Sequence, residues 1–169
     1  IDLNVFAVRL PSAIFGVLAV IGTYLLVKEL FPNAKKYSVF SIQYSVVELA
    51  ALLLAISPWH LQFSRIAFEA QVGLSLNIFS ILFFLKGLKK GIYLIPSVIL
   101  ASLSIYMYQS EKVYLPILFL VLTIIYFRDL IKLSKKLIIS TLLLGVILSL
   151  PMAVALFGDQ NALMRARGV

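Results

Sequence analysis

The chain has 169 residues, of which 62% are hydrophobic and only 13% are charged, and its mean hydropathy is +1.06. This composition excludes an ordinary soluble domain and predicts an integral membrane protein. The absence of Cys excludes disulfides, thiolate catalysis and cysteine metal sites. The net charge of +8 is spread over short connections between apolar runs, a pattern typical of membrane topology and not of a nucleic-acid partner.

Six apolar runs predict transmembrane helices, because a span must satisfy its backbone hydrogen bonds within the bilayer. In chain order they are Leu10–Phe31, Ile42–Ser57, Ile66–Leu85, Gly91–Ser110, Val113–Phe127 and Leu137–Phe157. We expect Pro11 in the first turn of the first span and Pro151 at a kink in the last. The fifth run is short, and we expect it to extend back through Glu111 and Lys112. The predicted fold class is all-α, a polytopic bundle of about six spans.

The sequence starts with Ile1 and shows no signal peptide before Arg9. We therefore interpret residues 1–169 as part of a single transmembrane domain that is truncated at both ends.

Basic residues alternate between the two sets of connections, and cytoplasmic loops carry the excess of Lys and Arg. Ten lie in one set: Lys28, Lys35, Lys36, Lys86, Lys89, Lys90, Arg128, Lys132, Lys135 and Lys136. Five lie in the other set: Arg9, Arg65, Lys112, Arg165 and Arg167. This bias predicts a multi-pass protein of the plasma (inner) membrane or an equivalent membrane, with the second set on the extracytoplasmic face.

Each predicted outer region places an acid near a base. The pairs are Glu69 with Arg65, Glu111 with Lys112, and Asp159 with Arg165 or Arg167. These pairs suggest a shared polar surface at the outer face of the bundle. Glu48 lies in the second predicted span, and the sequence suggests no role for it.

Residues 55–69 concentrate the candidate chemistry, because they hold the single His, the single Trp, Arg65 and Glu69. Ionisable residues near a bilayer are costly, and this makes the cluster a candidate functional site. The i, i+4 spacing of Arg65 and Glu69 predicts one helix face. They either shape a pocket, with Glu69 orienting an acceptor or helping to hold a divalent metal, or form an interfacial salt bridge that ends a span.

Two further cations and several aromatic residues allow a functional and a structural interpretation. His60 is a candidate metal ligand or proton carrier, or else a hydrogen-bonded interfacial His. Lys112, with Tyr108 nearby, suits a lipid-linked phosphate, or else anchors the span at the interface. Arg165 and Arg167 suit the same phosphate role, or else lie in a solvated loop. The aromatic residues form an anchoring belt or stack on a sugar: Trp59, Tyr106, Tyr108 and Tyr114.

Several short motifs occur in a recognisable order. They are Arg9-Leu10-Pro11-Ser12-Ala13-Ile14-Phe15-Gly16, Tyr24-x-x-x-Lys28-x-Leu30-Phe31, Ser57-Pro58-Trp59-His60, Phe63-Ser64-Arg65, Glu69, and Tyr106-x-Tyr108 through Pro116. Together they resemble membrane glycosyltransferases of the GT-C superfamily. The nearest group is related to dolichyl-phosphate-mannose protein mannosyltransferases and the bacterial aminoarabinose lipid A transferase, which belong to glycosyltransferase family 39 and its relatives.

The resemblance implies transfer of a hexosyl or pentosyl group from a polyprenyl-phosphate carrier to a lipid, glycan or protein acceptor on the external face. It implies an inverting displacement with a carboxylate base in the first external loop, before the Arg9 motif. We therefore expect this fragment to lack the base and to be inactive alone. Arg65, Glu69 and Lys112 match charged positions of the family.

Two other function classes remain as alternatives at this stage. One is a transporter or channel subunit, although no pair of Gly- or Pro-broken spans in corresponding halves points to a midplane site. The other is a structural membrane subunit without a site of its own.

Overall fold

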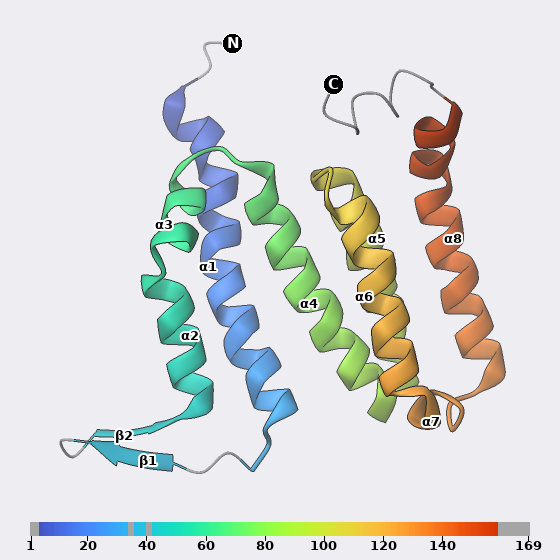
Figure 1. Cartoon of the computed structure of the whole chain (residues 1–169), viewed down its shortest axis with the longest axis horizontal. Helices are drawn as coiled ribbons and strands as arrows, with labels where there is room; N and C mark the ends of the chain where they lie inside the picture. Colours follow the sequence, from blue (N-terminus) through green and yellow to red (C-terminus); the bar gives the residue numbers. More distant parts are fainter. Residues whose placement is uncertain (1–3, 34–35, 40–41, 159–169) are drawn as a thin grey trace.

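The computed structural model of the chain describes residues 4–33, 36–39 and 42–158, and these form a bundle of upright helices (Figure 1). The elements in chain order are α1 (Val5–Leu30), β1 (Lys36–Val39), β2 (Ile42–Ser45), α2 (Val46–Ile56), α3 (Pro58–Arg65), α4 (Glu69–Lys89), a single 3-10 turn (Gly91–Tyr93), α5 (Leu94–Met107), α6 (Glu111–Ile125), α7 (Phe127–Leu130) and α8 (Lys135–Gly158). The all-α membrane bundle is confirmed, with one small antiparallel hairpin added to it.

The helices run alternately up and down, so the bundle has two ends. We call the end with α3, the α3–α4 connection and the α5–α6 connection the His60 end (Figure 1). We call the other end, where α4 and α6 finish and α8 starts, the lysine-rich end. Both ion pairs found in the described part of the chain lie there, Lys89 with Glu29 at 2.5 Å and Lys132 with Asp129 at 2.7 Å.

Within the residues that the structure describes, three helices are long and apolar enough to cross a bilayer: α1, α4 and α8. A fourth candidate span is the pair α2 and α3, which together pass the same test but are bent by 55°. The shorter helices α5 and α6 stand where the fourth and fifth spans were predicted, and α6 starts at Glu111 as expected.

The second predicted span starts later than expected, because Ile42–Ser45 is paired as strand β2. Ser45 adopts an extended conformation and caps α2, accepting a hydrogen bond from the Val47 amide. The Glu48 carboxylate accepts from the Ser45 amide at 2.8 Å, which completes a capping box. A local polar motif thus sets the start of α2, and Glu48 gains a structural role.

The placement of Pro11 in a first helical turn is wrong. Helix α1 starts at Val5, so Pro11 lies inside the helix. Membrane helices tolerate such an interior Pro because neighbouring groups can satisfy the freed backbone carbonyl.

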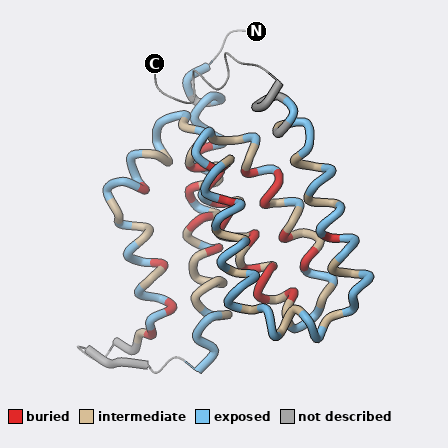
Figure 2. The backbone as a smooth tube through the Cα atoms, turned by 45° about the vertical axis from the view of Figure 1, so that its right-hand side comes forward, coloured by how far each residue is buried: buried red, intermediate tan, exposed pale blue. Residues whose placement is uncertain are grey.

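Helix α4 packs between α1 and α5 and has more buried residues than any other described helix. The buried segments run through the middle of the bundle (Figure 2). The buried side of α4 is unusually polar, since Gln71, Ser75, Asn77 and Ser80 are all buried. Ser80 and Ser97 donate to each other's backbone carbonyls at 2.8 Å, which joins α4 to α5. Small hydroxyl residues of this kind allow close helix packing in membranes. The outer helix α8 is almost wholly exposed, as expected for a lipid-facing surface.

Candidate functional site

Three segments that are distant in the sequence meet at Phe68, in the connection between α3 and α4. The Phe68 amide donates to Ser12 Oγ of α1 at 3.2 Å. The Phe68 ring stacks on Phe63 of α3, with centroids 5.1 Å apart, and meets Tyr108 edge-on at 5.8 Å. Tyr108 lies at the end of α5. Phe68 therefore joins the Arg9 motif, the Trp59–His60 region and the α5–α6 connection at the His60 end.

Arg65 and Glu69 do not share a helix face, which corrects the prediction from their spacing. Helix α3 ends at Arg65 and α4 starts at Glu69, with Ile66 and Phe68 extended between them. The Phe68 amide, bound to Ser12, no longer takes part in a continuous helix. Both side chains are exposed, and among the described residues no ion pair joins them. They flank the connection and remain free to meet a ligand.

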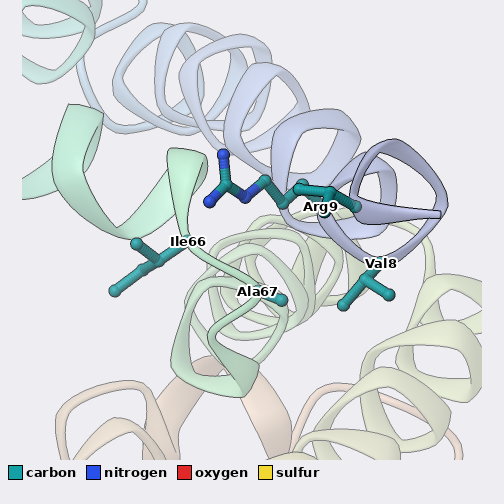
Figure 3. Close-up of a pocket in the computed structure, with 5 residues that line it drawn as sticks. Val8, Arg9, Ile66 and Ala67 are labelled. Atoms are coloured by element: carbon teal, nitrogen blue, oxygen red, sulfur yellow. The ribbon is translucent and has the colours of Figure 1, made fainter. Parts of the chain in front are cut away.

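A pocket of about 320 Å³ lies between the start of α1 and the α3–α4 connection (Figure 3). Its lining is Val5, Val8, Arg9, Ile66 and Ala67. The Arg9 side chain extends from α1 toward Ile66, which is the residue that follows Arg65 (Figure 3). An exposed guanidinium beside an apolar pocket can bind a phosphate with two parallel hydrogen bonds.

Arg9 was not predicted as a site residue, although it opens the first sequence motif. A clue was available, because Arg9 is the one charged residue in the 22 positions between Asn4 and Val27. A single charge inside an apolar span is costly and thus points to a function.

His60 is buried, with 7% of its surface exposed, and points into the bundle from α3. Its Nδ1 lies 3.3 Å from Nε2 of Gln71, which is 2% exposed. The Gln71 amide donates to Nδ1 when the imidazole is neutral and carries its proton on Nε2. His60 thus joins α3 to α4, which agrees with the hydrogen-bonded alternative.

The structure adds no further metal ligand that would support the hypothesis of a metal ion at His60 and Glu69. Within residues 4–33, 36–39 and 42–158 no three His, Asp or Glu side chains gather where they could hold a metal ion. A divalent metal therefore stays a prediction that the fold does not test.

The predicted pair of Glu111 with Lys112 does not form. Lys112 Nζ donates to Gln109 Oε1 at 2.9 Å, within the same connection. Glu111 turns inward instead and accepts from Asn77 Nδ2 at 2.7 Å. The reason is geometric: Glu111 and Lys112 are neighbours at the start of α6, and neighbouring helical residues point in different directions. The third predicted pair, Asp159 with Arg165 or Arg167, falls outside the described residues.

A larger groove of about 570 Å³ lies between α5, α6 and α8. It is apolar apart from hydroxyl groups, and no charged residue lines it. It offers no cation to a phosphate, so the His60 end carries the candidate site.

The fold and this site define a polytopic membrane protein with Arg9, Arg65 and Lys112 at the His60 end of its bundle. The model of the dolichyl-phosphate-mannose-protein mannosyltransferase family matches residues 1–154, and the chain belongs to this family of membrane glycosyltransferases. No curated protein and no solved structure matches the chain. The assignment confirms the resemblance found in the motifs and favours a glycosyltransferase over a transporter or a structural subunit.

Proposed function

We propose that the protein transfers a sugar from a polyprenyl-phosphate carrier to a lipid, glycan or protein acceptor at the His60 end of the bundle. The observation that carries the proposal is the meeting of three motif segments at Phe68, beside a pocket lined by Arg9, in a member of a mannosyltransferase family. A hexosyl or pentosyl group is the transferred unit, and the family's description favours mannose.

In this proposal the cations at the His60 end hold the carrier phosphate. Arg9 lies beside the pocket, while Lys112 and Tyr108 belong to the neighbouring connection. Arg65 adds a third exposed positive charge at the same end. Such an arrangement stabilises the negative charge that develops on a departing lipid phosphate. Glu69 lies in the first turn of α4, and in this proposal it orients the acceptor hydroxyl.

The chemistry we propose is an inverting displacement. The acceptor oxygen bonds to the anomeric carbon as the bond from that carbon to the phosphate oxygen breaks, and the electron pair leaves with the phosphate. A carboxylate base takes the acceptor proton. We expect this base in the external loop that precedes the Arg9 motif in the family, and we assign it to no residue of this chain.

The test is sugar transfer in membranes that contain the full-length protein, supplied with a panel of radiolabelled polyprenyl-phosphate sugars. We expect transfer from at least one donor, and a fall of about 10- to 100-fold in Arg65→Ala, Glu69→Ala and Lys112→Ala at matched abundance. Lys132→Ala, at the opposite end, is the matched control and should keep full activity. Transfer from no donor contradicts the function, whereas full activity in all three variants contradicts the site.

We also propose that the His60 end faces away from the cytoplasm. The excess of Lys and Arg at the other end supports this orientation. The chain has no Cys, so single cysteines can report the topology. Gln62→Cys on α3 should react with a membrane-impermeant maleimide in intact cells, and Ser134→Cys should react only after permeabilisation. The reverse labelling pattern contradicts the orientation.

A further inference from the structure

Glu111 is a buried carboxylate that the proposed transfer reaction does not use. It is 8% exposed, at the first position of α6, and its side chain packs against α4. Within the described part of the chain the Glu111 carboxylate takes part in no ion pair, and the hydrogen bond that it accepts comes from Asn77 Nδ2. A buried carboxylate with so little compensation is expensive in a membrane bundle.

The side-chain oxygen of Asn77 gives a second, independent indication of a bound group beside Glu111. Asn77 is 6% exposed, and its Oδ1 is a buried atom without a hydrogen-bond partner. Its orientation is fixed by the carboxylate, because an ionised Glu111 must face the NH₂ group and not the oxygen. Buried polar atoms are almost always satisfied, so an orphaned oxygen next to a buried carboxylate indicates a missing positive or donor group.

Other oxygen atoms surround the same spot. A Cβ added at Gly73 would lie 3.4 Å from Glu111 Oε1 and 3.7 Å from Ser104 Oγ, so both side chains lie over the Gly73 backbone. Ser104 Oγ donates a long hydrogen bond of 3.4 Å to the Gly73 carbonyl oxygen, which also lies within the hydrogen-bonded backbone of α4. The side chains of Glu111, Asn77 and Ser104 thus offer carboxylate, amide and hydroxyl oxygens, which are ligands that a hard cation prefers.

The charge of the site selects among cations. One carboxylate is matched by one positive charge, whereas a divalent ion would leave a net buried charge of its own. A proton on Glu111 would also neutralise the carboxylate, and it is the alternative that the test below separates from a bound cation.

We propose that Glu111, Asn77 and Ser104 form a binding site for a monovalent alkali cation between α4, α5 and α6. The cation neutralises Glu111, satisfies the Asn77 oxygen and holds the α5–α6 connection, with Tyr108 and Lys112, against α4. The site does not depend on the proposed sugar transfer, and its test does not require transfer activity.

The test measures the thermal midpoint, Tm, of the purified full-length protein in NaCl, KCl or choline chloride at equal ionic strength. We expect a Tm about 5 °C higher in one of the alkali salts at about 0.3 M than in choline chloride. Glu111→Gln keeps the hydrogen bond to Asn77 but removes the charge, and should abolish the difference. Glu69→Gln removes an exposed carboxylate from the start of another helix and should leave the difference unchanged.

A second variant tests the same cation site if Glu111→Gln does not fold. Asn77→Asp adds a second carboxylate at the same place, and its Tm should rise on addition of about 1 mM CaCl₂ or MnCl₂, whereas the wild-type Tm should not. Equal wild-type Tm values in all three salts would overturn the proposal, with a proton as the remaining counter-charge. An alkali effect that survives in Glu111→Gln would overturn it as well.

Discussion

Replacing Arg9 with Met should lower sugar transfer by about 10²- to 10³-fold, the loss typical of removing one group that stabilises charge in the transition state. The pocket beside Arg9 is otherwise lined by apolar residues, so no neighbouring cation in the lining can take its place. Met keeps much of the volume and removes the guanidinium. The measurement is the rate of transfer from the donor identified in the panel, at matched abundance in membranes.

Two controls separate the charge of Arg9 from its packing. Arg9→Lys keeps a positive charge but loses the planar pair of donors, and we expect an intermediate loss of about tenfold. Arg128→Met removes an exposed Arg at the lysine-rich end and should leave transfer unchanged. Wild-type transfer in Arg9→Met would show that the pocket does not hold the phosphate.

Replacing Gly16 with Leu should destabilise the bundle by about 3 kcal/mol and lower Tm by about 6 to 12 °C. A Cβ at Gly16 would lie 2.7 Å from Ser64 Cβ and 3.7 Å from Gln71 Nε2. Ser64 Cβ is attached directly to the backbone of α3, so it cannot move aside unless the helix moves. We expect α3 to shift away from α1 and the contact between His60 and Gln71 to be lost.

The matched control for Gly16 is Gly145→Leu in α8. A Cβ at Gly145 meets a single atom, Val98 Cγ1 at 3.0 Å, and Gly145 borders the large groove between α5, α6 and α8. A side chain can enter that groove, so the loss of Tm should be clearly smaller. Equal Tm losses in the two variants would mean that the close approach of α1 and α3 is not important for stability.

The two charged pairs predicted at the His60 end, Arg65 with Glu69 and Glu111 with Lys112, do not form as their spacing in the sequence suggests. An i, i+4 spacing places two residues on one face only if the helix is continuous, and the extended residues Ile66 and Phe68 break it. Ser12, 56 residues earlier in the chain, takes the Phe68 amide and holds that break in place. Likewise Asn77, 34 residues from Glu111, draws the carboxylate inward. Neither partner can be identified from local sequence.

The sequence by itself determined the membrane class, the all-α bundle, the approximate spans and the glycosyltransferase family. Apolar composition, the length of the apolar runs and the order of the motifs are local properties, so they can be read directly from the chain. Only the tertiary structure decided that Arg9 borders a pocket, that His60 pairs with Gln71, and that Glu111 is buried against Asn77. The physical reason is that burial and hydrogen bonding depend on which helices are neighbours, and that choice is made by packing across the whole bundle.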